Sequence, residues 1–74
     1  MIEYTVKVVK GGTRMWFLNG KRHREDGPAV EHPDGYKEWR FNGKVHREDG
    51  PAIEYASGKE EWWRHGCYMR EEEH

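Results

Sequence analysis

The chain has 74 residues, so it forms one small domain at most, and a domain of this length buries only a modest share of its surface. Charged residues make up 36% and aromatic residues 14%, and this aromatic content excludes a typical disordered chain, which is poor in aromatics. The 13 basic and 14 acidic residues give a net charge of -1, which excludes the global positive field that attracts nucleic acid or a membrane surface.

The chain opens with an alternation of apolar and polar side chains over residues 2–9, which predicts a half-buried strand. Gly11 and Gly12 predict a turn, and residues 13–18 predict a second strand that runs back along the first. No later segment combines apolar residues at helical spacing with capping residues, so we expect no helix.

Targeting signals are not expected either. Glu3, Lys7 and Lys10 interrupt the apolar run near the start, which argues against a signal peptide and against a membrane span. The single cysteine, Cys67, excludes an internal disulfide framework and fits a reducing compartment. We therefore expect a cytoplasmic protein.

A repeat of 23 residues follows the two predicted strands. The segment His-Arg-Glu-Asp-Gly-Pro-Ala occurs at 23–29 and again at 46–52, and Trp16, Trp39 and Trp62 recur at the same 23-residue interval. A fixed period of this length indicates an array in which each repeat is one supersecondary unit. The predicted single domain divides into an N-terminal hairpin at 1–15, repeats at 16–38 and 39–61, and a partial capping repeat at 62–74.

The Asn-Gly pairs at 19–20 and 42–43 predict tight hairpins, because both central residues of a type I′ turn need a positive φ. A two-residue loop fixes the strand register on either side of it. On one face the predicted cross-strand pairs are Trp16–His23, Trp39–His46 and Trp62–Met69. On the second face they are Phe17–Arg22, Arg40–Val45 and Trp63–Tyr68.

After each hairpin, Glu-Asp-Gly-Pro predicts a reversal, and the chain re-enters a strand at 29–31 and at 52–54. Residues 33–35, Pro-Asp-Gly, form the next turn, and two registers remain open there. Glu31 pairs with Lys37 if the loop has three residues and with Glu38 if it has two, and cross-strand charge favours Lys37. The predicted fold is all-β, a single twisted antiparallel meander of about six or seven strands, with a frayed charged end at 70–74.

The repeat pattern is carried by Trp16, Asn19, Gly20, His23, Arg24, Gly27, Pro28 and Ala29, and by Trp39, Asn42, Gly43, His46, Arg47, Gly50, Pro51 and Ala52. It resembles MORN-type repeats, in the variant W-x-x-N-G-x-x-H-R-x-D/x-G-P-A that is common in bacteria, phages and large DNA viruses. The third copy departs from it, because Met69 replaces the histidine and Gly-Pro-Ala is missing, as in a terminal cap. The resemblance implies a binding or scaffolding sheet and no catalytic activity.

His23 and His46 are candidate metal ligands, together with Glu25, Asp26, Glu48 and Asp49. Equivalent residues of a meander lie two strands apart, on the order of 10 Å, which is too far to share one ion. We therefore predict no metal site. Instead, we expect each imidazole to pack on its paired tryptophan and to hydrogen-bond a turn carbonyl.

The Arg-Glu-Asp segments could in principle supply paired carboxylates for acid–base catalysis. Such chemistry needs two carboxyl groups that flank a cleft, with one of them buried, and a domain this small leaves little room for a cleft. We predict no catalytic residue. Asp26 and Asp49 are expected to cap their turns, and Arg24 and Arg47 to pair with glutamates of neighbouring repeats.

The second face is the candidate binding surface. Its members are aromatic residues, arginines and one valine, a composition enriched at interface hot spots: Phe17, Arg22, Arg40, Val45, Trp63 and Tyr68. A single sheet is not stable with two wet faces, so this face needs a cover. Self-association into a dimer or larger oligomer, a different protein and a small ligand such as a nucleotide all remain open.

Together these features predict a small non-enzymatic binding protein without a cofactor and without strong nucleic-acid or membrane binding. A short free-standing set of such repeats resembles the proteins that phages carry to block a host defence protein, which would place it in the host cytoplasm. Two alternatives are an oligomer that sequesters a nucleotide signal and a structural or scaffold module.

Overall fold

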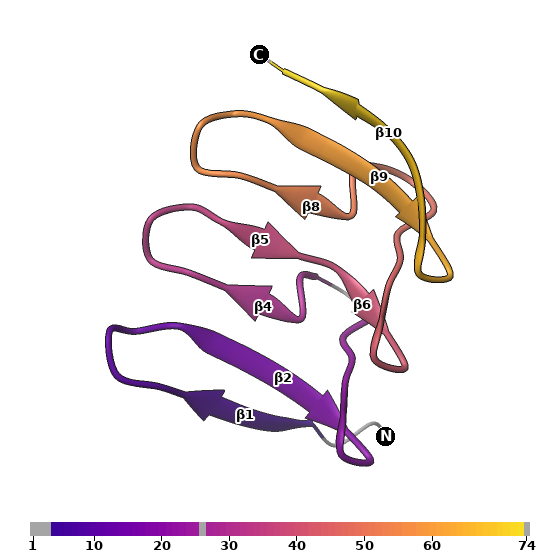
Figure 1. The fold of residues 1–74 in the computed structure, drawn as a ribbon. Coiled ribbons are helices and arrows are strands. Elements are labelled where there is room, and N and C mark those ends of the chain that lie inside the picture. Colours follow the sequence, from indigo (N-terminus) through magenta and orange to yellow (C-terminus); the bar gives the residue numbers. More distant parts are fainter. Residues whose placement is uncertain (1–3, 26, 74) are drawn as a thin grey trace.

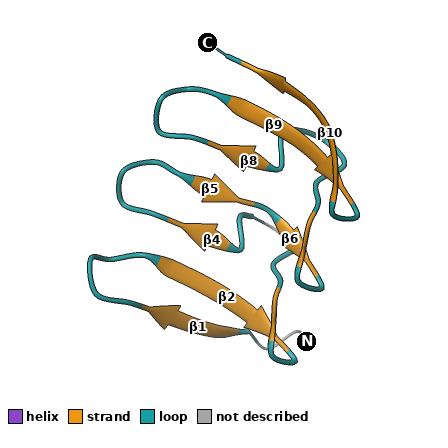
Figure 2. Cartoon of the chain, viewed as in Figure 1, coloured by secondary structure: helices purple, strands orange, loops and turns teal. Residues whose placement is uncertain are grey.

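The computed structural model describes residues 4–25 and 27–73, and these residues form strands, turns and loops without a helix (Figure 2). The predicted all-β antiparallel fold is confirmed. The strands are β1 (Thr5–Val8), β2 (Arg14–Leu18), β3 (Lys21–Arg22), β4 (Val30–Glu31), β5 (Lys37–Glu38), β6 (Arg40–Phe41), β7 (Lys44–Val45), β8 (Ile53–Glu54), β9 (Glu60–Arg64) and β10 (Cys67–Glu72). In the described chain, no helix is long or apolar enough to span a bilayer.

The main sheet has eight strands in the order β1-β2-β4-β5-β8-β9-β10, with β3 paired to β2, and β6 and β7 form a separate two-stranded ladder. Neighbouring strands are antiparallel throughout, and the sheet is open. Turns at 9–13, 32–36 and 55–59 line up along one side of the molecule, and the hairpin tips at 19–20, 42–43 and 65–66 line up along the other (Figure 1).

The hairpin tips adopt the predicted geometry. Asn19 and Asn42 have φ values of 53° and 51°, and the glycine after each also has a positive φ. His65 takes the same conformation, with φ at 51°, and Gly66 follows it. The third tip therefore repeats the first two, although a histidine stands where the others have asparagine, and histidine is among the residues that tolerate this region.

The open register at the 33–35 turn is settled in favour of the three-residue loop, because Glu31 faces Lys37 and Val30 faces Glu38. The equivalent turn around Gly58 has the same register, although it places Glu54 opposite Glu60. Like charges opposite one another are unfavourable, so charge pairing does not choose the register. Turn geometry does: each turn is closed by equivalent backbone hydrogen bonds, one from the amide of residue 32 to the carbonyl of residue 36 and the other from 55 to 59.

The core is thin and follows the repeat. Ala29 and Ala52 are fully buried, and Val30 and Ile53 are 5% and 7% exposed. Each buried alanine lies between two strands, because the carbonyl of Ala29 accepts a hydrogen bond from the amide of Trp16 while its own amide donates to the carbonyl of Glu38. Ala52 repeats these bonds with residues 39 and 61. The close approach of three strands explains why the Gly-Pro-Ala segment ends in a small residue.

The third hairpin differs from its prediction in two ways. A bulge at Met69 shifts the register, so Trp62 pairs with Arg70 and not with Met69. The chain then continues as β10 as far as Glu72, so the predicted frayed end at 70–74 is wrong for residues 70–72, and His74 lies outside the described residues. The bulge keeps an arginine beside the tryptophan, as in the first two repeats.

Candidate functional site

The three tryptophans of the repeat each carry an arginine guanidinium on the indole ring. The ring centroid lies 4.0 Å from the Arg24 guanidinium at Trp16, 4.0 Å from Arg47 at Trp39 and 4.1 Å from Arg70 at Trp62. This is cation–π geometry, and it recurs with the period of the sequence. Sequence reasoning assigned histidine to this place; the signal that was missed is an arginine at a constant distance after each tryptophan.

Arg47 is held by several further contacts. Its Nη1 donates to the carbonyl of Pro51 at 3.1 Å, and it forms ion pairs with Glu54 at 3.5 Å and Asp49 at 3.2 Å. Arg24 makes the equivalent contacts in the first repeat, a hydrogen bond to the carbonyl of Pro28 and an ion pair with Glu31. Each arginine thus pairs with a glutamate of its own repeat, which corrects the prediction of pairing between repeats.

Asp49 also departs from its prediction. Its carboxylate accepts a hydrogen bond from Nε of Arg47 rather than from a turn amide, and Asp26 lies outside the described residues. Gly50 allows the arginine to lie flat, because a Cβ at this position would come within 2.9 Å of the Arg47 Cζ. The glycine of the loop therefore makes room for a side chain, and its backbone is not in the left-handed region.

The histidines connect one repeat to the next. His23 Nδ1 accepts a hydrogen bond from the backbone amide of Asn42 at 2.9 Å, and His46 Nδ1 accepts one from the amide of His65 at 3.0 Å. Each imidazole thus binds a hairpin tip of the following repeat through an amide. The prediction that it binds a turn carbonyl and packs on tryptophan is wrong, because its ring contacts are with Phe41, Tyr4 or His65. The predicted backbone pairing is present, with the amides of His23 and His46 bonded to the carbonyls of Trp16 and Trp39.

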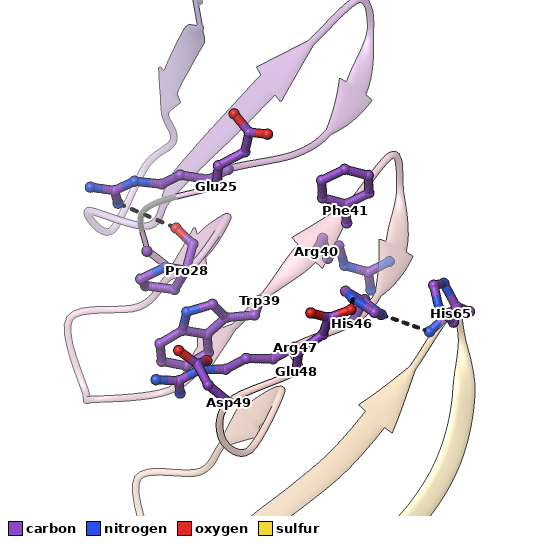
Figure 3. Close-up of a pocket in the computed structure, with 12 residues that line it drawn as sticks. Glu25, Pro28, Trp39, Arg40, Phe41, His46, Arg47, Glu48, Asp49 and His65 are labelled. Atoms are coloured by element: carbon purple, nitrogen blue, oxygen red, sulfur yellow. Dashed lines mark hydrogen bonds and ion pairs between the residues drawn. The ribbon is translucent and has the colours of Figure 1, made fainter.

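A groove of about 840 Å³ lies where the first two repeats meet, and we call it the central groove (Figure 3). It is lined by Arg24, Glu25, Gly27, Pro28, Trp39, Arg40, Phe41, His46, Arg47, Glu48, Asp49 and His65. Trp39 with its stacked Arg47 faces Pro28 across it, and Phe41, His46 and His65 stand at one end (Figure 3). A smaller groove of about 600 Å³ follows one repeat later, between Arg47 and the Trp62–Arg70 stack.

The charges in the central groove fall into two groups. The arginines are already engaged: Arg40, for example, bonds Glu38 at 2.7 Å and the carbonyl of Gly43 at 2.9 Å. The acidic side chains of Glu48 and Asp49 are 78% and 90% exposed. The groove therefore offers solvated carboxylates, stacked rings and compensated guanidinium groups, and no desolvated acid–base pair among its lining residues.

The predicted binding row is present as a set of cross-strand pairs. Phe17 faces Arg22, Arg40 faces Val45, and Trp63 faces Tyr68, as predicted. Of these six residues, only Arg40 lines the central groove. Of the predicted repeat residues Trp16, His23, Trp39, His46 and Trp62, the groove contains Trp39 and His46.

Two residues of this row are bound to carboxylates of the main sheet. Arg40 Nε and the Tyr36 hydroxyl both donate to Glu38, and Trp63 Nε1 and the Tyr55 hydroxyl both donate to Glu61. Burial, together with the hydrogen bond and the charge of Glu38, raises the pKa of Tyr36 above its ordinary value. The arginine and tryptophan of the row thus spend part of their hydrogen-bonding capacity within the molecule.

The side chains of the described residues form neither a cluster of metal-ligating groups nor an unsatisfied buried polar group. Over residues 4–25 and 27–73, no three His, Cys, Asp or Glu side chains come together as a metal site. In the same residues, every buried side-chain nitrogen or oxygen has a hydrogen-bond partner. Cys67, at the start of β10, is exposed and unpaired with another cysteine.

Comparison of this chain with family models, with curated proteins and with solved structures finds no match.

Proposed function

We propose that the protein is a non-enzymatic binding module whose partner is another protein, and that the partner docks over the central groove. The observation that carries this proposal is the groove itself, which spans two repeats and brings aromatic rings and arginines together with exposed carboxylates. Aromatic residues and arginines are the side chains most enriched at protein interfaces, and a polar rim commonly surrounds them.

Phe41 is the anchor that we assign to the interface. It is 43% exposed, although phenylalanine is a large apolar residue, and it lies between the rings of His23 at 4.5 Å and His46 at 6.1 Å. These neighbours hold the ring in place, so a partner gains apolar contact without having to order a loose side chain. The proposed anchor is therefore both exposed and supported.

The internal pairing of the arginines supports a protein partner over a nucleotide. A phosphate group would have to compete with Glu54 and Asp49 for Arg47 and with Glu38 for Arg40. A protein surface can instead use the exposed faces of the rings and place its own basic residues against Glu48 and Asp49. Catalysis is not part of the proposal, since the carboxylates of the groove are solvated.

The sequence resemblance to MORN-type repeats is part of the same proposal. It is supported by the recurrence, after 23 residues, of the arginine–tryptophan stack, the histidine-to-amide bond and the buried alanine. Such arrays commonly present an extended binding surface across several repeats. A host protein bound by a phage-encoded inhibitor is the partner class that we test first.

The test is affinity capture from a bacterial lysate with three matched baits: the wild-type chain, Phe41→Ala and Val8→Ala. Val8 is 64% exposed on β1, outside the groove, so Val8→Ala controls for loss of an exposed apolar side chain. We expect a partner that the wild type and Val8→Ala retain and that Phe41→Ala loses. Equal retention by Phe41→Ala, or no specific partner for the wild type, would refute the proposal.

A fourth bait separates the groove from the row predicted by sequence. Tyr68 is 49% exposed and belongs to the row but does not line the central groove. Loss of the partner with Tyr68→Ala and not with Phe41→Ala would move the interface to the row.

A thermal shift assay with a panel of nucleotides tests the alternative of a nucleotide ligand, because a ligand at a hundredfold excess over its Kd stabilises the folded protein by about 2.7 kcal/mol. We expect no such shift.

A further inference from the structure

The two edges of the sheet carry opposite charge. The segment that forms β1, β2 and the turn between them, residues 4–18, contains three basic residues, Lys7, Lys10 and Arg14, and no acidic one, with Glu3 just before it in the sequence. The C-terminal hairpin, residues 60–73, contains five glutamates, at 60, 61, 71, 72 and 73, and only two basic residues, Arg64 and Arg70. Because β1 and β10 are the edge strands of the sheet, these charges lie at its two ends (Figure 1).

Both edge strands are open to solvent. All four residues of β1 and all six of β10 are exposed. Among the described residues, the exposed large apolar side chains are Val6, Val8, Val9, Phe41, Tyr68 and Met69, and all except Phe41 lie on or next to an edge strand. An edge strand also presents backbone N–H and C=O groups that lack a partner on one side, so it can template the pairing of another strand.

From these observations we propose that copies of this chain associate head to tail, with β1 of one copy paired to β10 of the next. This inference does not depend on the partner proposed for the central groove. Attraction between a basic and an acidic hairpin favours the heterologous contact, whereas two N-terminal or two C-terminal hairpins would repel each other. The same charges thus select one pairing of edges and disfavour the two symmetrical ones.

The strand directions define the geometry of the contact. Six antiparallel steps separate β1 from β10, so the two strands run in the same direction within the sheet (Figure 1). Copies that continue the array by translation therefore pair β10 and β1 in parallel. Parallel ladders are slightly less stable per residue than antiparallel ones, so we expect a reversible association that depends on concentration. A heterologous contact of this kind produces an open chain of copies or a closed ring.

Interior strands show what the edge would gain. Lys7 of β1 faces Met15 of β2, and Val30 of β4 faces Glu38 of β5. Val30 follows Lys7 by 23 residues, as Glu38 follows Met15, so Lys7 and Val30 occupy equivalent positions in the repeat. Val30 has a strand on both sides and is 5% exposed, whereas Lys7 is exposed on a strand that has a neighbour on one side. A second copy would supply the missing neighbour, with carboxylates close to this lysine.

The experiment is sedimentation velocity of the full chain over a wide range of concentration, at low and at high salt. We expect wild-type association that weakens as salt rises, because the Debye length falls to about 3 Å at 1 M salt. Two charge-reversed variants are compared, Lys7→Glu/Lys10→Glu and Glu72→Lys/Glu73→Lys. Each should raise the apparent Kd of self-association by about tenfold or more, since like charges then meet at the contact.

An equal mixture of the two variants should restore the association, because each supplies the charge that the other lacks. Lys44→Glu, at an exposed position on β7 away from both edges, is the control for charge reversal and should associate like the wild type. A wild type that stays monomeric, variants that associate unchanged, or a mixture that fails to recover would each overturn the proposal. Circular dichroism of every variant establishes that it is folded, and the salt dependence of the wild type tests the proposal without any substitution.

Discussion

The interior strands β4 and β8 and the terminal strand β10 occupy equivalent places in the sheet but reach them by different routes. Met15 faces Val30, Glu38 faces Ile53, and Glu61 faces Glu71. In the interior, the chain makes the long excursion through His-Arg-Glu-Asp-Gly-Pro-Ala before it pairs again. At the end it passes directly from the hairpin into the ladder through the bulge at Met69.

This difference separates two roles of the repeat. The stack of arginine on tryptophan does not need the loop, because Arg70 lies 4.1 Å above Trp62 without it. The loop instead supplies a wall of the central groove and delivers the buried alanine. The interior repeats therefore build most of the surface that we assign to binding, whereas the terminal hairpin adds His65 to it and ends the sheet at β10.

The largest expected contrast is between Trp39→Ala and Trp62→Ala. Truncation of a fully buried tryptophan costs about 3–5 kcal/mol in unfolding free energy. Trp39 is half-buried and lies between two loops, so we expect a loss near the lower end of that range. The Trp62→Ala variant should lose about half as much unfolding free energy, because the side chain of Arg70 is 56% exposed and the stack on Trp62 is accessible to solvent. Urea denaturation followed by circular dichroism measures both, and equal losses would contradict the distinction.

His23→Phe and His46→Phe test the bond between repeats at a smaller scale. Each replacement keeps an aromatic ring and removes the Nδ1 acceptor, so a hairpin-tip amide loses its partner. The bond that His23 accepts is partly buried, and a buried donor left without a partner costs about 2 kcal/mol in unfolding free energy. His46→Phe should cost less, because the bond between His46 and the His65 amide is exposed and water can replace the lost acceptor. The reverse order would show that burial does not govern these bonds.

Arg47→Met and Arg70→Met compare the stacks themselves. Methionine keeps an apolar chain over the indole and removes the charge. The loss of stability relative to the wild type therefore measures the cation–π interaction together with the lost ion pairs. We expect a loss of about 1 kcal/mol for the partly buried Arg47 and a smaller loss for Arg70, as measured by thermal unfolding. Comparable losses would mean that the loop contacts of Arg47 add nothing to its stack.

The smallest expected effect is a dependence on pH that belongs to the terminal strand. Hydrogen bonds from Lys59 and Tyr68 hold the pKa of Glu71 below its ordinary value of 4.5, and the bond to Glu71 raises the pKa of Lys59 above 10.5. The carboxylate then contributes stability above pH 4.5 that is lost as pH falls through the lowered pKa. The ammonium contributes stability below pH 10.5 that is lost as pH rises through the raised pKa.

Glu71→Val tests this assignment, because it gives β10 the kind of residue that β4 and β8 carry at the equivalent position. The melting temperature of the variant should vary less between pH 2 and pH 5 than that of the wild type, in the range where the lowered pKa of Glu71 acts. Val30→Ile, at an interior position without a titrating group, is the control and should leave the acid dependence unchanged. An unaltered dependence in Glu71→Val would contradict the role of the pair.

The sequence determined the parts of this protein that depend on neighbouring residues. Asn19-Gly20 and Asn42-Gly43 specify narrow hairpins with positive φ, and the hairpins fix the pairs Phe17–Arg22 and Arg40–Val45. The 23-residue period specified that equivalent contacts would recur. These features follow from backbone geometry over a few residues, so local signals suffice.

The tertiary structure alone decided which side chains meet between repeats. The bonds from the Asn42 amide to His23 and from the His65 amide to His46 each join residues 19 positions apart, and no turn rule reaches so far. Whether arginine or histidine covers a tryptophan likewise depends on the path of the loop and on the room that Gly50 leaves. The central groove exists because two such loops lie side by side, two strands apart, and that arrangement is a property of packing rather than of any single stretch of sequence.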